Sequence, residues 1–222
     1  MTNALLAVSA GLMALCLYMI FLWVPTELNL GVSQRIFYLH VPLGMIGMVS
    51  IIIVAFASIM HLSTRNGKWD SLAYATAELG LIYATLIIVT GTIWAKPVWG
   101  VWWTWDAKLT TTLVLWFIFV GYMMLRAYGP SGSQGARYGS VVALMGAIDA
   151  PIIYYATEIW RTTHPDLNIG PLADPGSLDS RMAMTLQFSL VAFIFMFVCL
   201  LITRYALRRS EDKVDELFQF AS

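Results

Sequence analysis

Long apolar segments separated by short polar ones dominate the pattern of this chain. A bilayer core of about 30 Å requires roughly 20 apolar residues in helical form. Six segments reach that length, at about residues 4–24, 41–62, 72–94, 109–127, 139–159 and 183–207. Because backbone polar groups inside lipid must bond internally, these segments are predicted to be α-helices. The pattern therefore predicts an all-α integral membrane protein, with one domain of six transmembrane helices over residues 1–222.

Positive charge predicts which side of the membrane each connection faces. If six helices alternate, segments 25–40, 94–108 and 160–182 share one side, and the other side holds 63–71, 128–138 and the tail 206–222. The second side carries eight of the thirteen Lys and Arg residues: Arg65, Lys68, Arg126, Arg137, Arg204, Arg208, Arg209 and Lys213. The first side carries Arg35, Lys96, Lys108, Arg161 and Arg181. This excess favours cytoplasmic termini and external long connections.

Composition excludes several other classes of protein. With 59% hydrophobic and 12% charged residues, the chain does not have the composition of a soluble domain. Its net charge of zero means that the chain lacks the excess of positive charge typical of nucleic-acid-binding proteins. Cys16 and Cys199 lie in apolar segments outside any CxxC or CxxCH pattern, which indicates buried thiols. The start Met-Thr-Asn, which lacks Lys and Arg, favours retention of the first apolar segment as a span.

The segment from Trp94 to Asp106 is the densest aromatic stretch of the chain. It holds five of the nine tryptophans, interrupted by Lys96, Pro97 and Gly100, so it is predicted to be a connection rather than a span. Tryptophan favours the membrane interface, which makes an anchoring belt one interpretation. Its flat, rigid ring also suits a stacking platform for a flat hydrophobic ligand. Composition leaves both interpretations open.

Two histidines are expected beside this Trp-rich connection. His40 lies at the outer start of the second helix and His164 just past the outer end of the fifth, each close to a proline. His61, one helix length of roughly 30 Å further on, is predicted to be an ordinary residue of the opposite interface. Two imidazoles can supply both axial positions of a haem iron. The outer cations could then meet the haem propionates, Arg best because its fork is bidentate.

Other chemistry receives less support from the sequence. Structural zinc requires four ligands at short spacing, and a catalytic zinc site with Asp106 lacks an HExxH-like pair. Without a GxxxxGK[ST] motif, the chain has no ATP site of its own. Glu78 and Asp149 lie within predicted spans, where they serve either an ion path or a polar contact between helices. Two rival functions are a b-type haem redox subunit using quinone and a haem-free permease subunit.

A specific resemblance follows from Trp99-Gly-Val-Trp-Trp-Thr-Trp-Asp106. These residues resemble the WGxWWxWD (WWD) signature of haem-handling membrane proteins, and Ala-Lys-Leu-Thr-Thr-Thr-Leu continues the likeness into the next helix. The segments Gln34-Arg-Ile-Phe-Tyr-Leu-His-Val-Pro42 and Trp160-Arg-Thr-Thr-His164 also fit. Over nearly its whole length, the chain resembles the cytochrome c maturation protein C family, also called haem exporter protein C.

The resemblance implies haem transfer without enzymatic catalysis. His40 and His164 would be the axial ligands of a transient, non-covalent haem b at the periplasmic face of the bacterial inner membrane. The implied haem platform comprises Trp99, Gly100, Trp102, Trp103, Trp105 and Asp106. Trp102, Trp103 and Trp105 are expected on the ligand side, and Trp94 is expected to be a helix-end anchor. Implied partners are the ATPase and permease subunits of an ABC transporter (maturation proteins A and B), the small membrane protein D and the periplasmic haem chaperone E.

Overall fold

A computed structural model describes residues 2–130, 132–160, 162–164 and 178–221. Within these ranges the α-helices are α1 (Thr2–Tyr18), α2 (Phe37–Thr64), α3 (Gly67–Trp99), α4 (Ala107–Tyr128), α5 (Gly132–Ile159) and α6 (Ser180–Ala221). The π-helical segment η1 (Met19–Trp23) follows α1, and the 3₁₀ segment η2 (Val32–Ile36) precedes α2. Six helical segments of the described chain are long and apolar enough to cross a membrane. The predicted fold class is therefore confirmed.

The third helix is longer than predicted and takes in the first half of the Trp-rich segment. It continues through Pro97 and ends at Gly100, whose φ of 76° and N–H bond to the Lys96 carbonyl form its C-cap. This left-handed conformation favours glycine. The fourth helix starts after its N-cap, Asp106. The connection is thus residues 100–106, shorter than the predicted 94–108, and Trp94 and Trp99 are helical.

The sixth helix also extends beyond its predicted end near residue 207. The expected tail, 206–222, continues α6 as far as Ala221. Opposite charges one turn apart support this charged extension: Arg208 Nη2 lies 2.9 Å from Asp212 Oδ1, and Arg208 Nη1 lies 3.6 Å from Glu211 Oε2. Such pairs stabilise a helix locally, so the chain remains helical where its hydrophobic pattern ends.

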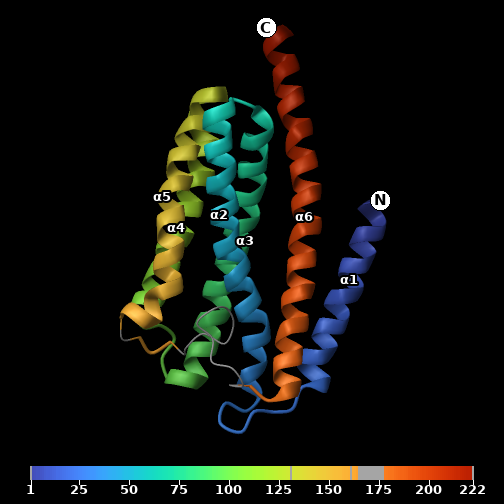
Figure 1. Cartoon of the computed structure of the whole chain (residues 1–222), viewed down its shortest axis with the longest axis vertical. Coiled ribbons are helices and arrows are strands. Elements are labelled where there is room, and N and C mark those ends of the chain that lie inside the picture. Colours follow the sequence, from blue (N-terminus) through green and yellow to red (C-terminus); the bar gives the residue numbers. More distant parts are fainter. Residues whose placement is uncertain (1, 131, 161, 165–177, 222) are drawn as a thin grey trace.

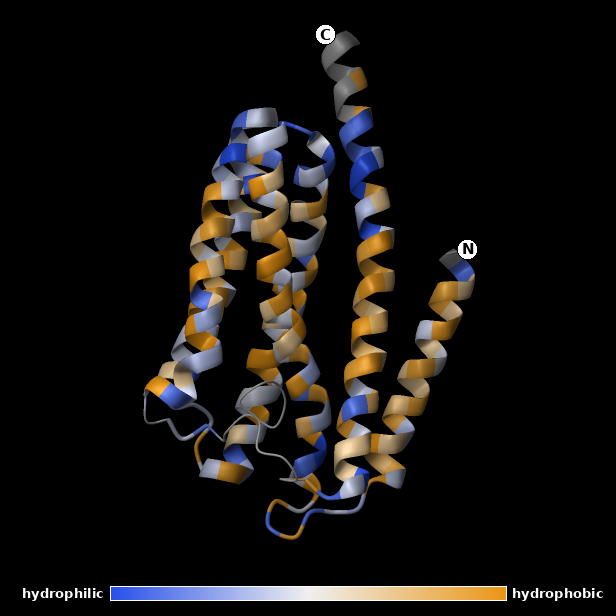
Figure 2. Cartoon of the chain, viewed as in Figure 1, coloured by the Kyte–Doolittle hydropathy of each residue, from blue (hydrophilic) through white to orange (hydrophobic). Residues whose placement is uncertain are grey.

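Helices α2 and α3 form the centre of the molecule (Figure 1). One hydrophobic core joins them to α1 and α6, and includes Cys16, Leu43, Tyr83 and Phe193. A second core, with Val54, Ala77, Phe119 and Ala150, joins them to α4 and α5. Hydrophobic residues cover the middle of the helices, while hydrophilic residues gather at the α2–α3 and α4–α5 turns and on the extension of α6 (Figure 2). Both termini point toward the end of the bundle that carries these turns (Figure 1).

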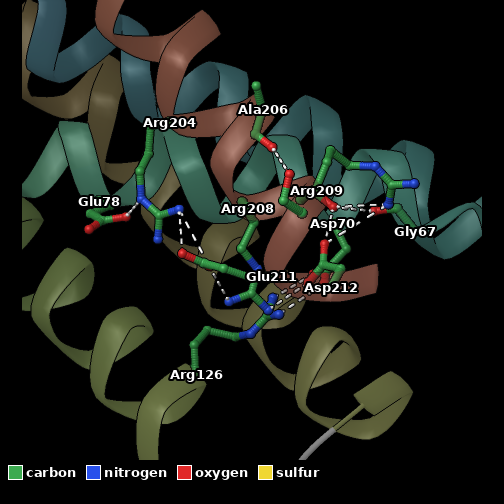
Figure 3. A network of polar contacts seen from close by, with 12 residues as sticks. Gly67, Asp70, Glu78, Arg126, Arg204, Ala206, Arg208, Arg209, Glu211 and Asp212 are labelled. Atoms are coloured by element: carbon green, nitrogen blue, oxygen red, sulfur yellow. Dashed lines mark hydrogen bonds and ion pairs between the residues drawn. The ribbon is translucent and has the colours of Figure 1, made fainter. Parts of the chain in front are cut away.

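Ion pairs fasten three helices together at this end (Figure 3). Arg126 of α4 contacts Asp70 of α3 through both guanidinium Nη atoms, at 2.5 and 2.9 Å. Arg204 Nε of α6 lies 2.5 Å from Glu78 Oε2 of α3. Glu78 therefore makes a polar contact between helices, which is one of the two interpretations left open by the sequence.

Candidate functional site

A cavity of about 380 Å³ lies at the opposite end of the bundle, beside the connection from α3 to α4. Residues of α2, α3 and α4 form most of its wall, together with parts of the connections. Its lining on α2 extends from Phe37 to Met48, a rise of about 16 Å along the helix. This volume falls within the usual range of small-molecule sites. Polar side chains such as His40, Lys108 and His164 lie near the helix ends, and apolar ones such as Met48 and Leu115 lie deeper in the cavity.

Both candidate histidines line this cavity. His40 lies in the first turn of α2, and its ring centroid is 5.8 Å from that of Trp94. His164 follows α5, and its ring centroid is 6.4 Å from that of Trp99. Each candidate ligand therefore has a neighbouring indole from α3.

A hydroxyl group and a glycine of α3 determine where the His40 ring can lie. His40 Nδ1 is 3.0 Å from Thr90 Oγ1. At the next position, a Cβ added to Gly91 would lie 2.9 Å from His40 Cε1. The missing side chain at position 91 thus makes room for the imidazole. Neither residue was predicted from the sequence, where an internal Thr-Gly pair in an apolar helix was the only available signal.

The variant Gly91→Ala is therefore expected to weaken ligand binding without unfolding the protein. Its methyl group would push the His40 ring from its place, since a contact below 3.0 Å must relax. Since the family resemblance implies that His40 binds haem iron, and a small misplacement of a ligand is costly, we expect about 10-fold weaker binding of added haem. A haem titration of the purified protein would measure this change. The control is Gly121→Ala in α4, where an added Cβ meets nothing within 4 Å; equal binding by both variants would contradict the expectation.

Asp106 connects the start of α4 to the segment that carries His164. Its Oδ1 accepts the backbone N–H of Leu109 at 3.0 Å, which caps the helix. Its Oδ2 accepts the hydroxyl of Thr163 at 2.9 Å and that of Thr104 at 3.2 Å. One carboxylate thus holds the α3–α4 connection and the residue before His164. Asp106 does not line the cavity itself. It positions the segments that do, through its contacts with Thr104 and Thr163.

The tryptophans divide differently from the sequence-based expectation. Trp94, expected to be an anchor, lines the cavity together with Trp99 and Trp103. Trp102 and Trp105 were expected on the ligand side, but they lie outside the cavity wall and are 57% and 76% exposed. The reason is that α3 continues to Trp99, so that the indoles of Trp94 and Trp99 point from the last turns of this helix into the cavity. The sequence order of the connection gave no information on ring direction.

The outer cations also differ in their surroundings. Lys108 lines the cavity, at the start of α4. Lys96 Nζ instead donates to the Gly100 carbonyl at 2.8 Å. Arg181 lies over the ring of Trp23, and Arg35 lines a separate small hollow. Arg161 falls outside the described residues. Among the described cations of this side, Lys108 is thus the one that lines the cavity.

A turn before η2 supports the rim of the cavity. The Glu27 carboxylate accepts the backbone N–H groups of Leu30 and Asn29, and Leu30 lines the cavity. These hydrogen bonds, above all that from Leu30, hold the pKa of Glu27 below its ordinary value. The turn closes at Gly31, where φ is +58°. Glu27 thus acts in the structure as a turn residue.

The remaining titratable candidates lie apart from the cavity. His61 is buried at the far end of α2, where its Nδ1 lies 3.3 Å from the Asn66 carbonyl oxygen. Asp149 of α5 is 8% exposed, and its Oδ2 has no hydrogen-bond partner among the described residues. In the same part of the chain, no group of three or more His, Cys, Asp and Glu side chains gathers around a metal position. The lining of the cavity thus includes the two imidazoles of His40 and His164.

Six membrane-length helices and an end cavity with two imidazoles among indoles define a multi-pass membrane protein with a candidate site for a flat, largely apolar ligand. Residues 1–217 match the family model described as Heme exporter protein C. The chain belongs to this family.

Individual relatives agree with this assignment. The Heme exporter protein C of Bradyrhizobium diazoefficiens is 33% identical over 196 residues, which cover 88% of this chain and 74% of the relative. The protein of the same name from Escherichia coli K12 is 33% identical over 180 residues, 81% of this chain and 72% of the relative. A mitochondrial protein of Marchantia polymorpha, named for cytochrome c biosynthesis, is 28% identical over 83% of this chain and 78% of its own length.

Proposed function

We propose that this protein holds haem for cytochrome c maturation at its outer face and delivers it to a haem chaperone. The observation that carries the proposal is the convergence of His40 and His164 on one cavity walled by tryptophans. Two neutral imidazoles are a suitable axial ligand pair for haem iron. The names of the family and of its relatives agree with this cargo.

The cavity suits the different surfaces of a porphyrin. Its apolar wall, with Met45, Met48 and Leu115, offers van der Waals contact to the ring. Trp94 and Trp99 lie beside the two histidines, and their indole surfaces would contact a flat ring held between these histidines. Lys108 at the rim offers a charge partner for a propionate. Haem b would be held as cargo, without a covalent bond and for a limited time.

The proposal assigns the cavity end to the periplasm and the termini to the cytoplasm of a bacterial inner membrane. The excess of Lys and Arg at the opposite end supports this orientation. The periplasmic chaperone, maturation protein E, would then dock over the exposed Trp102 and Trp105 and take the haem. Maturation proteins A, B and D would complete the assembly, with the ATPase supplying energy. The protein itself acts in binding and transfer and is not proposed to be an enzyme.

A comparison of three histidine variants tests the proposal. The wild-type protein and the variants His40→Ala, His164→Ala and His61→Gln would be purified after co-expression with the partner proteins. We expect the wild type and His61→Gln to show a haem absorption spectrum and to load the chaperone. His40→Ala and His164→Ala should lose both properties because each removes one axial ligand. Wild-type spectra and loading in both Ala variants would overturn the proposal, and a haem-free wild type would favour a structural permease subunit.

A further inference from the structure

The hydroxyl group of Thr90 lies between a backbone carbonyl and the candidate ligand His40. Thr90 Oγ1 is 2.8 Å from the carbonyl oxygen of Leu86 and 3.0 Å from His40 Nδ1. A hydroxyl has one hydrogen to donate and two lone pairs to accept with. Threonine in a helix commonly donates this hydrogen to the carbonyl four residues earlier. The contact with Leu86 has that spacing, so the hydrogen of Thr90 is directed along α3.

The partner of His40 Nδ1 is then an oxygen lone pair. Nδ1 must carry a hydrogen to bond to it, and a neutral imidazole carries only one such hydrogen. Nε2 is consequently left with its own lone pair, which is the group that coordinates a metal. From this arrangement we infer that Thr90 is a positioning residue that fixes His40 in the Nδ1–H tautomer and reserves Nε2 for haem iron. The inference rests on the proposed function and names the ligating atom.

The surroundings of the ring support a fixed orientation. Gly91 leaves the space that Cε1 of the imidazole occupies, and Trp94 stands one turn further along α3, with its ring centroid 5.8 Å away. Three neighbouring positions of α3 thus contact one ring of α2. Among the described residues no hydrogen bond involves Nε2, while Nδ1 is engaged by Thr90. A ring that is turned over would therefore lose its hydrogen bond to Thr90.

Such a partner has a measurable effect on ligand binding. A histidine that donates its second N–H to an oxygen acceptor is held in one orientation, and its ligating nitrogen becomes more basic. Loss of partners of this kind typically costs 10- to 100-fold in metal affinity. We expect the lower end of that range, about 10-fold, for Thr90, because the ring would still lie beside Trp94.

The tautomer can be observed directly in the protein without haem. The chain has three histidines, so histidine labelled with ¹⁵N in the ring gives few NMR signals, and His40→Ala identifies those of His40. We expect the Nδ1–H form in the wild type, a shift toward Nε2–H in Thr90→Val, and recovery in Thr90→Ser, which keeps the hydroxyl. Thr92→Val is the matched control, since Thr92 also bonds back to its own helix, at Ile88. A wild type in the Nε2–H form, or Thr90→Val with an unchanged tautomer, would overturn the inference.

Haem titration of the same proteins separates this inference from the proposed function. We expect about 10-fold weaker binding in Thr90→Val and near wild-type binding in Thr90→Ser and Thr92→Val. If both His40→Ala and His164→Ala bind haem as the wild type does, the proposed function itself fails. If His40→Ala loses haem while Thr90→Val binds it with wild-type affinity, the proposed function stands and Thr90 has no positioning role.

Discussion

Replacing Arg126 with Met is expected to destabilise the protein by about 3 kcal/mol, because it leaves a largely buried carboxylate without its partner. The Arg126 and Asp70 side chains are 7% and 16% exposed, and their ends meet in two contacts between α4 and α3. Arg126 also lies over the rings of Tyr74 and Tyr122. Met retains much of the apolar stem and removes the charge. Unfolding by denaturant in detergent micelles would measure the change.

Two further variants distinguish the effect of the unpaired Asp70 charge on stability from the effect of lost side-chain packing. Arg126→Met combined with Asp70→Leu should recover most of the stability, because apolar replacement of both members of a buried pair is often nearly neutral. Arg209→Met is the less buried counterpart: its side chain is 28% exposed, its Nη1 lies 4.0 Å from Asp212 and 3.4 Å from Ser71 Oγ, and we expect a loss below about 1 kcal/mol. A double variant as unstable as Arg126→Met alone would contradict the charge argument.

The six spans were predictable because their signal is local. A membrane-crossing helix needs one uninterrupted apolar segment of about 20 residues, and each of the six spans contains such a segment within its own sequence. The boundaries were less predictable. Lys96 and Pro97 were predicted to lie in a connection, yet α3 continues past them to its C-cap at Gly100. Similarly, polar composition suggested that the last helix ends near residue 207, whereas pairs such as Arg208–Asp212 accompany its extension.

The candidate site was predictable only where a motif marked it. His40 and His164 stood out by residue type and expected side of the membrane, and the structure brings them to one cavity. Thr90 and Gly91 did not stand out, since their role depends on how α3 is rotated against α2. The contact of Glu78 with Arg204 likewise joins helices that are distant in the sequence. These are contacts between helices, so the local hydrophobic pattern of any one helix could not predict them.

Asp106→Ala is expected to reduce haem affinity about 100-fold, the upper end of the effect of losing a ligand's supporting partner. The variant removes the acceptor of the Thr163 hydroxyl and with it the tether next to His164. It also removes the cap of α4, at a cost of about 1 kcal/mol in stability. Haem titration and denaturant unfolding of the same protein would measure the two effects separately.

The two roles of Asp106 can be separated with matched variants. Thr163→Val removes the tether and leaves the cap intact, so it should weaken haem binding about 10-fold with little change in stability. Asn66→Ala removes a comparable N-cap acceptor, that of the Lys68 N–H at the start of α3, at the opposite end of the bundle from the cavity. It should cost about 1 kcal/mol in stability and leave haem affinity unchanged. If Asn66→Ala weakened haem binding as much as Asp106→Ala, general loosening of the helix ends would explain the result, and the tether to His164 would not.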